Sequence, residues 1–257
     1  MAGLPLHNPW ALAAGILGNI ASIMVFLVPI STFYRIYKKK STEEFQSVPY
    51  VVALFSAMLW LYYAFIKTNE ILLIMVNSFG VIMESMYIII FLFYAHEKAR
   101  IYAVKIITFL IVGVFSLIVL ATLFLVRGHE KRVEVIGWIC VAFAVSVFAA
   151  PLSIMKQVIE TKSVEFLQFH LSFFLTLSAI TWFLYGFLIR DKYVMLPNVL
   201  GFIFGSAQMI LHVIYKKKPT DCCMNKSLET INKPEKNDDQ KINSCEWAKN
   251  NDMTSPV

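Results

Sequence analysis

Residues 25–31 read Val-Phe-Leu-Val-Pro-Ile-Ser, and residues 147–153, which lie 122 positions later, read Val-Phe-Ala-Ala-Pro-Leu-Ser. The same spacing relates Lys-Ser-Thr-Glu at residues 40–43 to Lys-Ser-Val-Glu at residues 162–165. A constant spacing across segments of different composition indicates an internal repeat rather than a chance likeness of apolar residues.

The repeat extends through the apolar stretches that follow each copy. Residues 56–63 match residues 178–185, and a tryptophan stands at the fifth position of both. Beyond a one-residue deletion the spacing becomes 121, and Asn77 then matches Asn198, each with a glycine three residues later. Three apolar segments therefore correspond in order in the two halves of the chain.

The composition is that of a membrane protein. Of the 257 residues, 58% are apolar and 16% are charged, whereas soluble domains are about 25% charged. The mean hydropathy is +0.65. A soluble enzyme is therefore excluded. The net charge of +6 does not indicate nucleic-acid binding, because the basic residues lie in short clusters beside apolar runs, as the positive-inside rule describes.

Seven apolar runs are long enough to cross about 30 Å of hydrocarbon. We predict helices, because a backbone in lipid must satisfy its own hydrogen bonds and these runs lack the alternation of barrel strands. The predicted spans, which we expect the lipid bilayer to surround, cover residues 10–34, 47–66, 71–94, 102–126, 133–157, 169–189 and 193–215.

The fourth span has no counterpart in the repeat. Three spans reverse the direction of a chain, so the extra span restores it and the two repeats run parallel. The sequence thus predicts an all-α membrane protein of 3+1+3 helices. Its predicted parts are an extracellular N-terminus (1–9), a first three-helix repeat (10–94), a linker helix with its loops (95–132), a second repeat (133–215) and a disordered cytosolic tail (216–257).

The basic residues of the loops predict the orientation. Twelve Lys and Arg residues lie on one side, including the start of the tail, and six lie on the other, so we expect the N-terminus outside and the tail in the cytosol. The sequon at Asn225 then stays unglycosylated. Cys222 and Cys223, close after the last span, are either palmitoylated or ordinary thiols.

Several motifs of this chain resemble those of plant SWEET sugar transporters over residues 11 to about 215. The resemblance implies a plasma-membrane uniporter that moves sucrose, with glucose as a second substrate, in either direction as a homo-oligomer. It implies neither a cofactor nor an enzymatic reaction. The motifs are Gly-Ile-Leu-Gly-Asn (15–19), Phe-Leu-Val-Pro (26–29), Lys-Ser-Thr-Glu-Glu-Phe (40–45), Phe-Ala-Ala-Pro (148–151) and Leu-Pro-Asn-Val (196–199).

Asn77 and Asn198 carry amides inside apolar helices, where an unpaired amide is costly. They can bond neighbouring helices to each other, or they can bind a ligand that the two repeats share. Bonds between helices are worth only about 0.6–2 kcal/mol, so the repeat-related positions favour the ligand. The resemblance implies that both amides hydrogen-bond sugar hydroxyls.

Trp60 and Trp182 admit two interpretations, since tryptophan also marks the membrane interface. Each has a serine four residues earlier, on the same helix face. The resemblance implies that the tryptophans stack on the sugar and that small neighbours set its size, as in the sucrose-preferring branch. Small residues also permit close helix packing. The pocket residues so expected are Trp60, Trp182, Ser56, Ser178, Val25 and Val147.

Prolines in spans remove backbone hydrogen bonds, so Pro29, Pro49 and Pro151 are candidate hinges or plain helix-end residues. The resemblance implies a fourth proline where this chain has Gln168, which makes the inner gate less symmetric.

At the outer end, the resemblance implies a gate formed by Tyr63, Lys67 and Asp191. Without the resemblance, Lys67 and Asp191 would be read as ordinary surface loop charges.

Glu84 lies well inside a span, and a buried carboxyl can relay protons. Proton-coupled sugar symport is therefore the alternative mechanism, although the counterpart of Glu84 is Gly205 and a protonated carboxyl can also bond a neighbouring helix. The alternative class of protein is a seven-span receptor. The internal repeat argues against this class, and so does the lack of an N-P-x-x-Y pattern in the last span. The sequence carries no metal-ligand cluster and no nucleophile–base motif.

Overall fold

The computed structural model describes residues 8–43, 45–68, 70–162 and 169–215, and every regular element in these ranges is helical. The predicted tail with its sequon and paired cysteines, and Gln168 of the predicted inner gate, lie outside the described residues. In chain order the helices are α1 (Pro9–Leu27), α2 (Ile30–Lys39), α3 (Val48–Lys67), α4 (Ile71–Tyr94), α5 (Glu97–Ile107), the π-helical η1 (Thr108–Phe115), α6 (Ser116–Phe124), α7 (His129–Val147), α8 (Ala149–Thr161), α9 (Phe169–Leu188) and α10 (Lys192–Tyr215).

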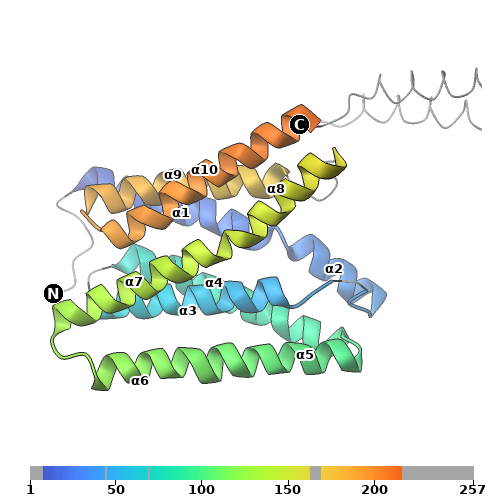
Figure 1. The fold of residues 1–257 in the computed structure, drawn as a ribbon, viewed down its shortest axis with the longest axis horizontal. Helices are drawn as coiled ribbons and strands as arrows, with labels where there is room; N and C mark the ends of the chain where they lie inside the picture. The colour runs from blue at the N-terminus through green and yellow to red at the C-terminus, as the bar shows by residue number, and fades with distance from the viewer. Residues whose placement is uncertain (1–7, 44, 69, 163–168, 216–257) are drawn as a thin grey trace, which may run out of the picture. The chain divides into compact units, whose positions relative to one another are not determined.

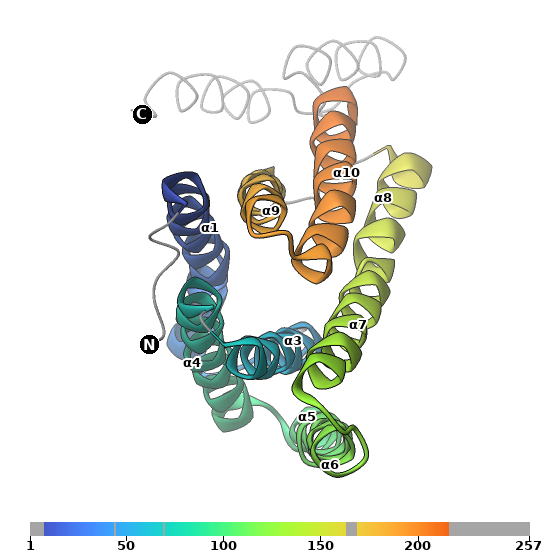
Figure 2. The same cartoon turned by 90° about the vertical axis from the view of Figure 1, so that its left-hand side faces the viewer.

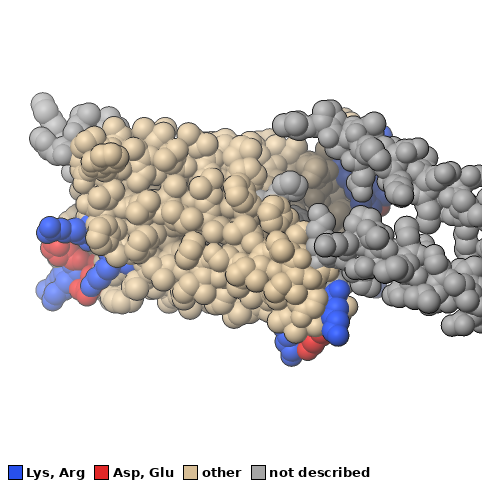
Figure 3. Space-filling view, turned by 90° about the horizontal axis from the view of Figure 1, so that it is seen from above, with Lys and Arg blue, Asp and Glu red and all other residues tan. Residues whose placement is uncertain are grey.

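Seven stretches of this structure are long and apolar enough to cross a membrane. Three of them join consecutive helices, namely α1 with α2, α5 with η1 and α6, and α7 with α8. On the face drawn in Figure 3, charged side chains lie at the ends and the band between them is uncharged. Phe93 and Phe124 are more than three-quarters exposed, which suits contact with lipid. The predicted all-α, seven-span membrane fold is confirmed.

The helices repeat as the sequence does. α1 and α7 have 19 residues each, α3 and α9 have 20, and α4 and α10 have 24. In Figure 1, α1, α4, α7 and α10 run in one direction, while α3 and α9 run in the other. The linker helix, α5 to α6, restores the direction between the two sets, so the repeats are parallel.

Both repeats interrupt their first span at corresponding places. Pro29 lies in the break between α1 and α2, and Pro151 lies in the first turn of α8, just after the break that follows α7. The residue that follows each of α2 and α8 is a lysine in the left-handed conformation, Lys40 with φ 55° and Lys162 with φ 49°. Pro49 is instead the second residue of α3, where a missing N–H costs no helical bond.

The loop after α2 carries a small ion-pair cluster. The Glu43 carboxylate accepts a hydrogen bond from Lys39 at 2.5 Å and pairs with Arg35 at 2.7 Å. The bond from Lys39 is the main cause that lowers the pKa of Glu43, so this exposed carboxyl stays ionised beside the basic residues of the loop.

The two repeats pack on each other through close helix contacts. α4 lies between α1 and α3, while α1 packs on α9 and α3 packs on α7 across the repeats (Figure 2). A Cβ on Gly15 of α1 would lie 2.4 Å from Leu72 and 3.0 Å from Tyr185. A Cβ on its repeat counterpart, Gly137 of α7, would lie 2.5 Å from the Tyr193 ring. Both glycines therefore permit the close helix approach seen in membranes, Gly15 within its own repeat and across to Tyr185, and Gly137 within the second repeat.

The linker helix lies at one edge of the bundle. α5 and η1 contact α3, and α6 contacts α7. Tyr62 of α3 and Thr122 of α6 join their hydroxyls at 2.8 Å. This bond ties the linker to the first repeat without crossing to the second.

Candidate functional site

A cavity of about 300 Å³ lies where the two repeats meet. α1, α3 and α4 line it from the first repeat, and α7 to α10 line it from the second. The helices that enclose it are seen end-on in Figure 2. The predicted site residues that the structure brings to its wall are Asn77, Asn198, Trp60, Trp182, Ser178 and Pro151.

The two asparagines have the same surroundings in both repeats. Asn77 donates from its side-chain amide to the Leu73 carbonyl at 2.8 Å, and Asn198 donates to the Val194 carbonyl at 2.6 Å. Each bond spans one helical turn and uses one of the two amide N–H donors. The amide oxygen and the second N–H of both residues remain suited to a ligand in the cavity.

The two tryptophans of the cavity wall differ in their polar contacts. Trp182 donates from Nε1 to Ser22 Oγ at 3.0 Å, and Ser22 and Ser178 join their hydroxyls at 2.8 Å. A Cβ on Gly18 would lie 3.0 Å from the Trp182 ring, so this glycine lets the indole rest on α1. Trp60 packs edge-on against Tyr63, with ring centroids 5.7 Å apart.

Other predicted pocket residues lie beside the cavity wall instead of on it. The cavity is not lined by Val25, Val147 or Ser56, and the Val147 side chain is 38% exposed. Their neighbours form the wall as repeat-related pairs that the sequence analysis missed, namely Ser22 with Ala144 and Phe26 with Phe148. The repeat spacing of 122 contained this signal, since both pairs keep it.

One proline that was not predicted as a hinge contributes to the site. Pro197 lies inside α10, is buried and lines the cavity one residue before Asn198. A proline within a helix removes a backbone bond to the preceding turn. It therefore adds a weak point in α10 next to the asparagine.

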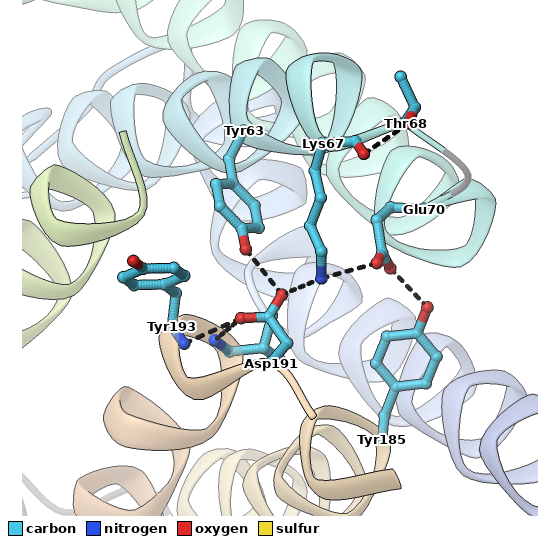
Figure 4. A network of polar contacts seen from close by, with 8 residues as sticks. Tyr63, Lys67, Thr68, Glu70, Tyr185, Asp191 and Tyr193 are labelled. Carbon is cyan, nitrogen blue, oxygen red and sulfur yellow. Dashed lines mark hydrogen bonds and ion pairs between the residues drawn. The ribbon is translucent and has the colours of Figure 1, made fainter. Parts of the chain in front are cut away.

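Tyr63, Lys67 and Asp191 meet in one polar network (Figure 4), and Tyr63 contacts the cavity-lining Trp60. The Tyr63 hydroxyl donates to Asp191 Oδ2 at 2.7 Å, and the Lys67 ammonium pairs with the same oxygen. Asp191 Oδ1 accepts from the backbone N–H groups of Tyr193 at 2.9 Å and Val194 at 3.2 Å, which caps the start of α10. Asp191 is only 4% exposed, so these partners support a buried carboxylate.

Glu70 and Tyr185 complete this network and were missed by the sequence analysis. Lys67 Nζ lies 2.8 Å from Glu70 Oε1, and the Tyr185 hydroxyl donates to Glu70 Oε2 at 2.7 Å. Glu70 is 7% exposed although it precedes α4 at the end of a span. Its repeat position, 121 residues before Asp191, was the signal.

Glu84 lies on α4, outside the cavity wall. Its side chain is 4% exposed, and within the described ranges its Oε2 atom has no hydrogen-bond partner. Among residues 8–43, 45–68, 70–162 and 169–215, no group of three His, Cys, Asp or Glu side chains could hold a metal ion. The side chains that line the cavity offer amides, hydroxyls and indole rings to a ligand.

Two parallel three-helix repeats around a shared cavity, covered at one end by a polar network, define a membrane transporter. The family model "Sugar efflux transporter for intercellular exchange" matches the chain twice, over residues 13–99 and 134–220. The chain belongs to this family, whose plant members are called SWEET transporters, as its motifs predicted. Since the family is one of transporters, the prediction that the protein is not an enzyme is confirmed, and the receptor alternative is excluded.

Two curated relatives and one solved structure support this assignment. "Bidirectional sugar transporter SWEET13" from Oryza sativa subsp. japonica is 61% identical over 215 residues, which are 84% of this chain and 72% of the relative. "Bidirectional sugar transporter N3" from Medicago truncatula is 57% identical over 210 residues, 82% of this chain and 78% of the relative. A solved structure of a eukaryotic SWEET transporter superposes with a TM-score of 0.76 at 35% identity, covering 83% of this chain and 100% of the other.

Proposed function

We propose that this protein is a facilitative transporter that moves sucrose, with glucose as a second substrate, in either direction by alternating access. The observation that carries the proposal is the pair of asparagines and the pair of tryptophans around one cavity at the repeat interface. Membrane transporters built of repeats bind their substrate at such an interface. The names of the relatives, bidirectional sugar transporters, agree with it.

The chemistry of the cavity wall suits a sugar. Asn77 and Asn198 offer donors and acceptors for hydroxyls, while the indoles of Trp60 and Trp182 offer flat apolar faces for the C–H groups of a ring. The cavity, at about 300 Å³, lies at the lower end of the range for pockets that enclose small ligands. Neutral polar groups fit an uncharged substrate.

Alternating access needs a gate at each end of the cavity. Tyr63, Lys67 and Asp191 form the outer gate in this proposal, since their contacts join the two repeats. Pro29 and Pro151, at the helix breaks, are the proposed inner hinges. Pro49, at the start of α3, is the third proposed hinge. Val25, Val147 and Ser56 then tune substrate size from positions beside the wall.

Uniport is favoured over proton symport by the position of Glu84. Its carboxyl lies outside the cavity wall, and its counterpart in the second repeat is Gly205. A coupling carboxyl would be expected to face the substrate or its path.

The proposed location is the plasma membrane, with the N-terminus outside, the tail in the cytosol and the chain in a homo-oligomer. The excess of basic residues in the loops at the tail side supports this orientation. In this orientation the tyrosine–carboxylate network faces the outside, and the breaks in the first and fifth spans face the cytosol.

The test is transport of radiolabelled sucrose and glucose in oocytes that carry this chain at the surface. Uptake and efflux should both follow the sugar gradient, and a proton uncoupler should leave them unchanged. Surface-expressed chain that moves neither sugar would contradict the proposal. Accumulation against a gradient that collapses with the uncoupler would establish symport instead.

A further inference from the structure

The outer network holds a second tyrosine–carboxylate pair that mirrors the first. The Tyr63 and Asp191 oxygens lie 2.7 Å apart, and so do the Tyr185 and Glu70 oxygens. By the repeat, Tyr185 is the counterpart of Tyr63, and Asp191 is the counterpart of Glu70. Each tyrosine thus bonds the carboxylate of the opposite repeat, and two crossed bonds join the repeats at this end (Figure 4).

Lys67 connects the two pairs. Its ammonium lies 2.8 Å from Glu70 and also pairs with Asp191. Both carboxylates are more than nine-tenths buried, and a buried carboxylate is stable only with charged or strongly donating partners. The two carboxylates share this one cation. A movement of Lys67 away from either carboxylate therefore also disturbs its pair with the other.

The same tyrosines pack on the cavity wall. Trp60 meets Tyr63 edge-on at a centroid distance of 5.7 Å, and Trp182 meets Tyr185 edge-on at 5.4 Å. Both tryptophans line the cavity. Each crossed bond is therefore one ring contact away from the cavity wall, so a ligand that shifts an indole would also push on a tyrosine.

We propose that Glu70 and Tyr185 are gating residues. Their hydrogen bond forms a second latch, and it holds this end closed as strongly as the first latch, which is the bond between Tyr63 and Asp191. Both latches break together when the repeats separate at this end. The proposal rests on the proposed function, which makes this separation part of every transport cycle. Loss of one charge-assisted hydrogen bond should shift the equilibrium toward the open state by about tenfold.

The experiment measures access to the cavity without using sugar. Ala144, which lines the cavity, is replaced by cysteine in a full-length chain whose four native cysteines are replaced by alanine. Intact cells then receive a membrane-impermeant thiol reagent, and the labelling rate of this cysteine is measured. Tyr185→Phe and Glu70→Gln should each raise the rate about tenfold, as Tyr63→Phe should.

Tyr62→Phe is the matched control. It removes the same hydroxyl from the neighbouring residue of α3, but its bond to Thr122 ties the linker helix and does not cross the repeats. The labelling rate should stay at the parent value. Surface amounts are measured with a tag, so that a variant that fails to fold is recognised. Glu70→Gln keeps an acceptor oxygen but removes the charge that holds the Tyr185 hydroxyl and the Lys67 ammonium, so it serves beside Tyr185→Phe as an independent weakening of the same latch.

The proposal is overturned if Tyr185→Phe and Glu70→Gln, present at the surface, label at the parent rate while Tyr63→Phe labels faster. It is also overturned if Tyr62→Phe raises the rate as much as they do. A failure of the proposed function looks different, since labelling would then respond to the latch variants as expected while the parent chain moved no sugar.

Discussion

The two repeats agree at the middle of the bundle and differ at the end opposite the tyrosine–carboxylate network. At the middle, Asn77 and Asn198 make the same backbone bond and face the same cavity. At the opposite end, the first repeat stacks Phe33 on Tyr87 at 4.5 Å and sets Tyr50 edge-on to Phe33 at 4.8 Å.

The second repeat has unlike residues at the same positions. Gln208 stands where the first repeat has Tyr87, and Ser172 stands where it has Tyr50. The Ser172 hydroxyl lies 3.2 Å from Gln208 Oε1, and Gln208 lines the cavity. The matched layer thus offers two equal amides to the cavity. The unmatched layer offers only Gln208 of the second repeat, because Phe33, Tyr50 and Tyr87 of the first repeat pack outside the cavity wall.

The largest effect is expected from the matched layer. Asn77→Ala and Asn198→Ala should each abolish measurable sucrose flux at normal surface amounts. A sugar hydroxyl left unpaired in a dry site costs up to about 3 kcal/mol, or about 150-fold in binding, which would take the flux below detection. Tracer uptake per surface molecule checks this. If one variant transported normally, the two asparagines would not be equivalent and the site assignment would fail for that repeat.

Asn19→Ala is the control for these variants. Asn19 is buried and donates to the carbonyls of Gly15 at 2.9 Å and Leu72 at 3.0 Å, so it serves packing. Its loss should lower the surface amount more than the flux per molecule.

The next effect tests the unmatched layer. Gln208→Tyr gives the second repeat the residue of the first and adds volume to the cavity wall. Steric rejection should lower sucrose flux about tenfold and glucose flux much less. Gln208→Leu, of similar size to glutamine, should leave the ratio of the two fluxes nearly unchanged. Equal loss of both sugars in Gln208→Tyr would point to damaged packing.

A smaller effect is expected from the valines beside the wall. Replacing Val25 and Val147 together by leucine adds a methylene from each repeat, and one methylene is worth about 1–3 kcal/mol in a close-fitting site. The double variant should lose several-fold in sucrose flux and keep its glucose flux. Competition of the two labelled sugars in one assay measures the ratio. Unchanged sucrose flux would remove the valines from the size filter.

The smallest effect is expected at Glu84, whose counterpart is a glycine. Glu84→Gln keeps the shape and removes the ionisable proton, so sucrose flux should stay within about twofold of the parent. Flux measured at two outside pH values should respond alike in both proteins. A pH response that vanishes in the variant would support proton coupling.

Much of this fold could be predicted because membrane helices are encoded locally. Seven apolar runs and a constant spacing of 121 to 122 residues gave the spans, the repeat and the parallel arrangement. The first span continues past the predicted residue 34 to Lys39, since a turn with lysines can extend beyond the hydrocarbon and snorkel to the interface. Hydropathy alone does not predict such a turn as part of the helix, because its lysines are polar.

The details of the candidate site were harder to predict, because they depend on the rotation of each helix and on contacts between repeats. Val25 was expected in the pocket, whereas its neighbours Ser22 and Phe26 line the cavity. Glu70 resembles a surface charge in the sequence and becomes buried only when Tyr185 of the other repeat reaches it. Such pairings across the repeat interface have no local sequence pattern.

Lys67 stands alone in the network, because the second repeat has Ile189 at the corresponding position. Two separate identical half-length chains in this arrangement would have to supply two lysines or none, and the buried carboxylates would face either two cations or no cation. Joining the halves into one polypeptide removes this restriction. In one polypeptide each half can mutate independently, so the single Lys67 ammonium can pair with both carboxylates. The strength with which this end closes can then evolve in steps that a symmetric dimer cannot take.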